Sequence, residues 1–248
     1  MFTLGVRTPG GETIQPIRLG LEQAINYRFI YEKTRITIAA SLVEPATGEE
    51  LITLRIQDPT PGIWTFLVET VGEIYNGEFH MWLPLRQFMN AENFFLESSP
   101  YITLTEPAFA GEAITVSVYN SDNNSFYINS GRGFSRLGGI KPDLSAPGVE
   151  ISLLRGTGTG SGLAAALTAG AVAQFMQWAV VEGNNVVVGS REVKNFFIRG
   201  ANRSIDLIYP NREWGYGRLA LEGAFNAMRN LRHFVRALFH IYVEKGKK

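Results

Sequence analysis

The chain has 248 residues, of which 45% are hydrophobic, and its 23 basic and 23 acidic residues leave no formal net charge. This length can bury one large core or two medium ones, and the balanced charge gives no field that would attract nucleic acid or an anionic membrane. Cysteine is absent, which excludes disulfides, thiolate nucleophiles and zinc–thiolate sites.

The first 92 residues have the pattern of an all-β module. Hydrophobic residues alternate along four stretches, at residues 36–42, 52–56, 64–68 and 79–83. Turns rich in proline and glycine separate these stretches, which predicts an antiparallel sandwich or jelly roll. His80 is interpreted as a half-buried strand residue, because a lone histidine lacks the partners that a metal or a catalytic base needs. The opening residues Met1–Arg7 do not have the pattern of a secretory signal.

The second part of the chain alternates short strands with helices. We predict strands over 114–119 and 149–154, helices over 163–181 and 191–199, a helix from 219, and an amphipathic helix over 230–242 that docks on its own domain. Asp143 stands between the two strands in the segment Lys141–Gly148. An aspartate flanked by proline usually satisfies nearby backbone donors, so we favour that role over a catalytic one.

A glycine-rich loop, residues 156–162, leads directly into the helix over 163–181. A strand, a glycine turn and a helix in this order point backbone N–H groups and the positive end of the helix dipole at one place. The helix is apolar on all faces, which predicts burial in a domain interior. Its alanine and glycine content, with Gln174 and Gln177, fits a buried helix better than one that faces lipid. The loop lacks a complete phosphate-binding motif, because Ser161 stands where a glycine is needed.

Three blocks of this second part resemble the subtilisin-like serine proteases (subtilases, peptidase family S8). They are Lys141–Gly148, the helix segment Ala164–Gly170, and Trp214–Leu219. The first part, which includes Phe79–Pro84, resembles the jelly-roll module inserted in the Csp subtilases, which act in germination of clostridial-type spores. The resemblance implies an all-β jelly-roll module over 1–92, followed over 93–248 by the C-terminal portion of a subtilase α/β domain with a parallel sheet and a buried central helix. It also implies a location in the spore or the cytoplasm.

The same resemblance identifies the position of the nucleophile. In subtilases the serine stands in Gly-Thr-Ser, eight residues before the glycine that ends Ala-Gly. Counting back from Gly170 gives Gly162, within Gly160-Ser161-Gly162, so the hydroxyl is missing. Ser161 is adjacent, but a slip of one residue turns a helical side chain by about 100°, and triad chemistry tolerates little misplacement.

The other parts of the triad are also missing. The family's Asp-[Ser/Thr]-Gly and His-Gly-Thr-His contexts do not occur in the sequence, and its oxyanion-hole asparagine would lie upstream of Met1. Because the triad groups act as a unit, we predict a catalytically inactive subtilase, a pseudoprotease or part of one, with a binding or regulatory role. It resembles the inactive Csp paralogues that regulate germination.

The resemblance further suggests partners for such a protein. They are an N-terminal subtilase half, an active paralogous subtilase, or a small-molecule germinant such as a bile acid. The candidate ligand-binding loop consists of Thr159, Gly160, Ser161 and Gly162. It would offer N–H groups to a carboxylate, a peptide or a small anion. We predict no metal site and no cofactor.

Two alternatives stay open. One is an active serine endopeptidase that uses Ser161 or is completed by a separate N-terminal half. The other is a carbohydrate-binding module with Trp64, Tyr75 and Trp82 as platforms. The alternation of Trp64 with Phe66 favours a core position for that tryptophan instead.

Overall fold

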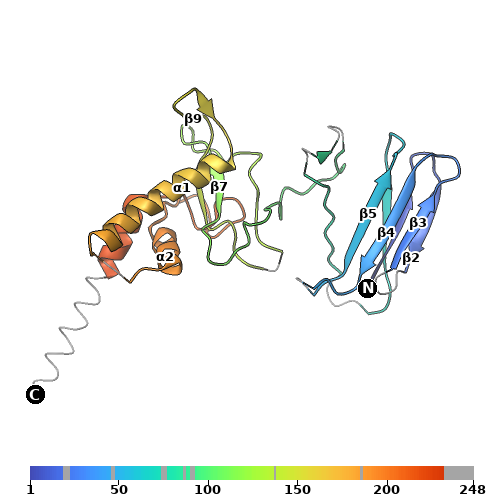
Figure 1. Ribbon diagram of the computed structural model, residues 1–248, viewed down its shortest axis with the longest axis horizontal. Coiled ribbons are helices and arrows are strands. Elements are labelled where there is room, and N and C mark those ends of the chain that lie inside the picture. The colour runs from blue at the N-terminus through green and yellow to red at the C-terminus, as the bar shows by residue number, and fades with distance from the viewer. Residues whose placement is uncertain are drawn as a thin grey trace, which may run out of the picture. The chain divides into compact units, whose positions relative to one another are not determined.

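We analysed a computed structural model of the chain. It describes residues 1–18, 23–45, 48–73, 77–85, 88–89, 93–136, 138–184 and 187–231. The chain forms two compact units, Met1–Asn93 and Phe94–Lys248 (Figure 1). The sequence-based division falls one residue earlier, after residue 92. Each unit is described by itself.

The first unit consists of antiparallel strands. These are β1 (Phe2–Arg7), β2 (Thr13–Ile17), β3 (Gln23–Arg28), β4 (Arg35–Ser41), β5 (Leu51–Gln57) and β6 (Thr65–Thr70). They form two three-stranded sheets with the orders β2-β1-β6 and β3-β4-β5. In the second sheet Ile38 of β4 lies opposite both Ile25 and Leu54, so apolar side chains of three strands meet on one face.

The two sheets share one hydrophobic core. Its buried members come from both sheets and from the turn after β3, and they are Leu4, Val6, Ile14, Phe29, Ile36, Ile38 and Ala40. The alternation along β4 therefore follows burial, as predicted. Trp64 packs edge-on against Phe29 with ring centroids 5.9 Å apart, which gives this tryptophan a core role. A jelly roll has eight strands in two Greek keys, and the described residues form six, so the jelly-roll topology stays a prediction.

The predicted strand over 79–83 does not form, and that prediction is wrong. The segment has no regular secondary structure. A strand needs a hydrogen-bonding neighbour; the segment instead makes aromatic contacts, with Phe79 edge-on to Phe2 at 5.8 Å and His80 against Trp82 at 5.4 Å. His80 is half-buried, but outside a strand, and its Nε2 lies 3.5 Å from Oε1 of Glu78.

The second unit is built on a short parallel sheet. Strand β7 (Val116–Tyr119) pairs in parallel with β8 (Leu144–Pro147). A parallel bridge from Ser145 to Arg218 extends the pairing on the far side of β8. A small antiparallel hairpin, β9 (Ile151–Ser152) with β10 (Thr157–Gly158), precedes the first helix. Of the strand predicted over 149–154, only the two residues of β9 form a strand.

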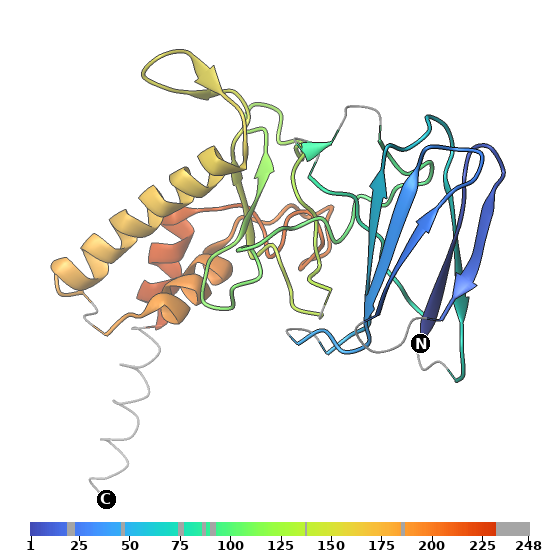
Figure 2. The same ribbon diagram turned by 45° about the vertical axis from the view of Figure 1, so that its right-hand side comes forward.

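Helices follow the hairpin. They are α1 (Ser161–Met176), the π-helical turn η2 (Gln177–Val181), α2 (Ser190–Gly200) and a helical stretch at residues 221–231. The predicted helix over 230–242 lies outside the described residues from 232 onward. Both views place α2 and the 221–231 stretch along one side of α1 (Figures 1 and 2).

The core of the second unit lies on the side of α1 that faces α2 and the 221–231 stretch. Near the start of α1, Ala164 packs with Val118 of β7 and Ala146 of β8. Farther along, Phe175 is fully buried among Phe196 and Phe197 of α2 and other apolar residues. These contacts hold α1 against the sheet and against α2.

The prediction that α1 is a buried central helix holds for one side only and is otherwise wrong. Within α1 the buried residues are Ala164, Thr168 and Phe175, while many positions on the other side are exposed. The physical reason is that α2 and the 221–231 stretch lie along the opposite side, while on this side both views show the β9–β10 hairpin beside the start of α1 (Figures 1 and 2). Among the described residues, the helical segment Ser161–Val181 is long and apolar enough to cross a membrane, with a mean hydropathy of 1.4. Core helices of soluble proteins can be equally long and apolar.

Candidate functional site

The loop before α1 is held by three hydrogen bonds. The N–H of Gly160 donates to the carbonyl of Gly148 over 2.8 Å, and Thr159 Oγ1 accepts the N–H of Glu150 over 2.9 Å. Gly160 has φ 157° and ψ 165°, a conformation that L side chains rarely adopt. The N–H of Leu163 then donates to the carbonyl of Gly160 over 3.2 Å. The start of α1 is therefore anchored to the segment that follows β8.

Gly162, the predicted nucleophile position, lies in the first turn of α1 and is exposed. A Cβ atom added to Gly162 would meet nothing within 4 Å. The site therefore has room for the Cβ of a serine, but glycine supplies no hydroxyl there. Ser161, the first residue of α1, is also exposed, but it projects from the helix in a direction about 100° away.

No histidine accompanies these positions within the described part of the second unit. Of the three histidines in the sequence, His80 belongs to the first unit, while His233 and His240 lie outside the described residues. The described residues also contain no group of three His, Cys, Asp or Glu side chains that could hold a metal ion. The structure thus brings the loop residues 159–162 together without bringing a described histidine to them.

Asp143 has a structural environment. Its Oδ2 accepts the N–H of Thr115 over 2.8 Å and the ammonium of Lys141 over 2.7 Å, and its Oδ1 lies 2.6 Å from Nζ of Lys194. The Asp143 side chain is only 2% exposed. Burial lowers the pKa of Lys141, although the hydrogen bond and the charge of Asp143 oppose that effect. A carboxylate held by two cations and a backbone donor is not available as a base, which agrees with the favoured prediction.

Sequence reasoning did not find Lys194 as a partner of Asp143. Lys194 comes from α2, and its Nζ also donates to the carbonyl of Gly111 over 3.0 Å. Nothing in the spacing of these residues along the chain indicates the contact, because only the packing of α2 against the 111–115 segment creates it.

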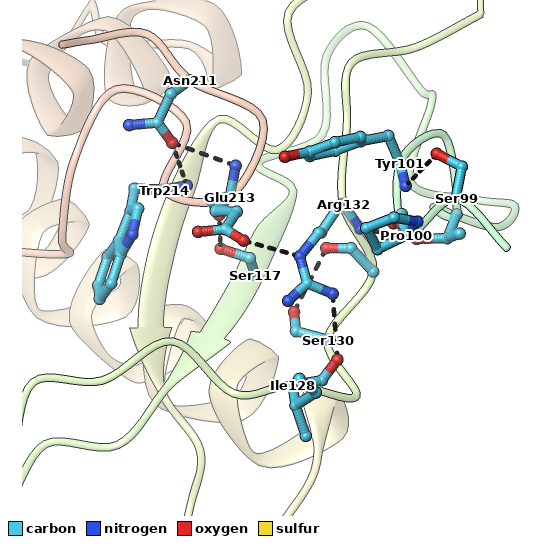
Figure 3. Close-up of polar contacts among 12 residues, drawn as sticks. Ser99, Pro100, Tyr101, Ser117, Ile128, Ser130, Arg132, Asn211, Glu213 and Trp214 are labelled. Carbon is cyan, nitrogen blue, oxygen red and sulfur yellow. Dashed lines mark hydrogen bonds and ion pairs between the residues drawn. The ribbon is translucent and has the colours of Figure 1, made fainter. Parts of the chain in front are cut away.

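A second polar network joins the segment after β7 to the turn at 211–214. Figure 3 shows Arg132 Nε donating to Oε1 of Glu213 over 2.8 Å. Its Nη1 donates to the carbonyl of Ile128 over 3.1 Å. Oδ1 of Asn211 accepts the backbone N–H groups of Glu213 and Trp214 over 3.1 and 2.7 Å. This network fixes the turn that carries the Trp214–Leu219 block.

Two surface hollows of the described part of the chain lie away from the loop 159–162. One, of about 260 Å³, lies beside the second network and is lined by Pro100, Thr103, Ile128, Asn129, Ser130, Gly131 and Arg132. The other, of about 440 Å³, lies in the first unit and is lined by residues 28–33. In the loop itself, Thr159, Ser161 and Gly162 are exposed.

The fold and these motif blocks define a class of protein. The subtilase family model matches residues 97–217, which lie within the second unit. A search of curated proteins found no match. The solved structure of the Clostridium perfringens CspB protease is similar to 92% of this chain and 50% of that chain, with a TM-score of 0.80 and 30% sequence identity.

The family-model match over residues 97–217 and the similarity to this structure support a subtilase, as the sequence predicted. The similarity to the CspB protease also supports the Csp type. The chain spans about half the length of that structure's chain.

Proposed function

We propose that the chain is a catalytically inactive Csp-type subtilase that binds a protein partner and regulates it. One observation carries this proposal: glycine occupies position 162, where the resemblance to subtilases places the nucleophile, and a Cβ added there would meet nothing within 4 Å. Loss of the nucleophile in a triad enzyme lowers kcat on the order of 10⁶-fold. A partner that supplied a base and a carboxylate would not replace it.

The loop geometry supports this proposal over the alternative in which Ser161 attacks. Gly160 and its hydrogen bond to Gly148 fix where α1 begins. Ser161 and Gly162 therefore have set directions. For the Ser161 hydroxyl to take the place of a side chain at position 162, the chain would have to shift by one residue along the helix. Nucleophilic attack needs the reacting atoms about 3 to 3.5 Å apart and aligned, so such a displacement abolishes the reaction.

The regulatory role follows from the resemblance to inactive Csp paralogues, and we extend it to a role in spore germination. The partner we favour is a subtilase polypeptide, either an N-terminal half or an active paralogue. A small-molecule germinant at the loop 159–162 is the second candidate ligand. Thr159 already uses its hydroxyl to hold Glu150, so such a ligand would rely on backbone N–H groups.

A fluorophosphonate probe, which labels activated serines, tests the proposal. We expect no labelling of the wild-type protein under conditions in which an active subtilase is labelled completely. Labelling that disappears in Ser161→Ala would overturn the proposal and establish an active hydrolase. Gly162→Ser, which has room for its side chain, is the matched variant: it restores the hydroxyl and should remain unlabelled without a base.

A further inference from the structure

We propose that the outer face of the β3–β4–β5 sheet binds an extended acidic segment of a partner protein. We call this surface the arginine face. It consists of every second residue from 24 to 28 in β3, from 35 to 41 in β4 and from 51 to 57 in β5, and its charged members are Arg28, Arg35 and Arg55. The inference goes beyond the proposed function, because it concerns the first unit and uses no residue of the loop 159–162.

The strand register brings the three arginines together. Arg28 of β3 lies directly opposite Arg35 of β4. Arg55 of β5 lies opposite Thr37, two residues along β4 from Arg35. Figure 1 shows the three strands side by side in the first unit. Directly opposite residues have Cβ atoms about 5 Å apart and diagonal neighbours are about 7 to 8 Å apart, so the three side chains start from one corner of the arginine face.

No described carboxylate neutralises this corner. The arginine face has no Asp or Glu at any of its positions, and none of its three arginines forms an ion pair with a described acidic residue. Two glutamates in neighbouring turns hold backbone instead. Glu12 accepts the N–H groups of Ile30 and Tyr31 over 2.9 and 3.2 Å. Glu32 accepts the N–H of Gly10 over 3.0 Å.

The arginine pair across β3 and β4 has an energetic consequence. Like charges directly opposite each other destabilise a sheet, and both arginines are exposed to solvent. Local arrangements that cost stability without a compensating contact are expected at functional sites. An anion that binds between the guanidinium groups would remove the repulsion, which favours a binding role for the corner.

A hollow adjoins this corner at the turn between β3 and β4. It is lined by residues 28–33, so Arg28 belongs to both the hollow and the arginine face. Ile30 and Tyr31, which also line it, are 78% and 88% exposed. The hydrogen bonds from their N–H groups to Glu12 hold this turn in place. Exposed apolar side chains on a fixed turn provide an anchoring place for a hydrophobic side chain of a partner.

The order of these features specifies the ligand. Arg55 lies two residues inside the row of Arg35, and the turn lies just beyond that row. Alternate side chains of an extended chain are about 6.6 to 6.8 Å apart, close to the diagonal spacing of the two arginines. Guanidinium groups bind carboxylates in a bidentate manner. A segment with the pattern acidic-x-acidic-x-hydrophobic would therefore place its carboxylates on the arginines and its hydrophobic side chain at the hollow.

The arginine face fits an acidic protein segment better than nucleic acid or a membrane. Sheets that bind single-stranded nucleic acid stack bases on aromatic side chains, and the arginine face has none. Anionic membranes attract clusters of about four to eight basic residues, whereas this face carries three. The chain as a whole has no net charge, so a long polyanion would gain no attraction beyond the corner.

Fluorescence anisotropy with the full chain tests the proposal. The probe is the fluorescein-labelled peptide Glu-Ser-Glu-Ser-Phe, and we expect saturable binding that weakens with added salt. A triple variant with Arg28→Gln, Arg35→Gln and Arg55→Gln should weaken binding by roughly tenfold or more, because each exposed pair contributes about two- to fivefold. Thermal melts should show that this variant is no less stable than the wild type, since the like-charge contact is gone.

The controls match the charge and the hollow separately. A second triple variant removes the same charge from exposed positions of the second unit, with Arg155→Gln, Arg199→Gln and Arg229→Gln, and should bind as the wild type does. The peptide Gln-Ser-Gln-Ser-Phe should not bind. Tyr31→Ala should weaken binding of Glu-Ser-Glu-Ser-Phe but not of Glu-Ser-Glu-Ser-Ala, because only the former places a side chain at the hollow.

Each outcome decides the matter. No saturable binding by the wild type, equal binding by the two triple variants, or equal binding of the glutamine peptide would overturn the proposal. Vesicles of phosphatidylserine and phosphatidylcholine and a single-stranded oligonucleotide are tested in the same way. Binding of either that is tighter than that of the peptide and lost in the first triple variant would also overturn it. None of these results bears on the proposed function, which fluorophosphonate labelling tests at a different site.

Discussion

The N–H of Gly160 donates to the carbonyl of Gly148 over 2.8 Å, which joins the end of β8 to the start of α1. The approach is close: a Cβ built on Gly148 would lie 2.9 Å from the carbonyl oxygen of Gly160 and 2.7 Å from Cγ1 of Val118. Gly148 belongs to one motif block and Ala164, 3.1 Å from the same Cβ position, belongs to another. The contact therefore connects two of the three blocks that carry the resemblance to subtilases.

Gly148→Ala should destabilise the protein, because the new methyl group must displace backbone at Gly160. Overpacking of this kind costs about 1 to 3 kcal/mol, measurable as a lower urea midpoint. Gly170→Ala is the control: its Cβ has open space, and replacing glycine within a helix stabilises by up to about 1 kcal/mol. Equal stabilities of the two variants would show that Gly148 and Gly160 are not in close contact.

Asp143→Asn should be strongly destabilising. The change leaves Lys141 and Lys194 without their shared counter-charge in a buried place, and breaking a buried pair from one side costs about 3 to 5 kcal/mol. Asp122→Asn, at an exposed position, should change the free energy of unfolding by no more than about 0.5 kcal/mol. Denaturant unfolding measures both. A small effect of Asp143→Asn would mean that the two ammonium groups do not depend on this carboxylate.

The sequence predicts local features of this fold better than the relations between its elements. The register that identifies Gly162 as the nucleophile position depends only on counting within one helix. That position stays a prediction, and the structure places Gly162 in the first turn of α1. The prediction of a strand over 79–83 was wrong, because the alternation of hydrophobic residues indicates which face each side chain would take but not whether a neighbouring strand is available. The pairing of Asp143 with Lys194 likewise depends on packing between distant segments.

The burial of α1 shows the same limit. Both sides of the helix are apolar, so its pattern cannot indicate which side faces the core. Tertiary packing determines which side is buried. Phe175 packs against the aromatic residues of α2, while Ala169 on the other side has only small residues as neighbours along its row of the helix. The sequence therefore predicted a buried helix, and the structure gives a helix with one buried side.

The ion pair between Glu112 and Arg191 should make a pH-dependent contribution. Oε1 of Glu112 lies 2.7 Å from Nη2 of Arg191, and the hydrogen bond from Arg191 lowers the pKa of Glu112 below its usual 4.5. A lowered folded-state pKa means that the contribution is present above the unfolded pKa and is lost as the pH falls through the folded one.

Glu112→Gln should therefore lower Tm at neutral pH, and the difference from wild type should close as the pH falls from about 7 to about 3. Added salt should narrow the difference at neutral pH, since the pair is exposed and screened. Thermal melts across this range measure both effects. A difference in Tm that stays constant with pH would contradict a role for the charge of Glu112.

The two sides of α1 should differ sharply in their response to truncation. Phe175 is fully buried and stacks on Phe225 with centroids 5.6 Å apart, so Phe175→Ala should cost about 3 to 5 kcal/mol. Leu167 is 43% exposed, so Leu167→Ala should lower the free energy of unfolding by about 1 kcal/mol or less. Urea unfolding compares the two variants. Similar losses would mean that both sides of the helix are already covered in the isolated chain.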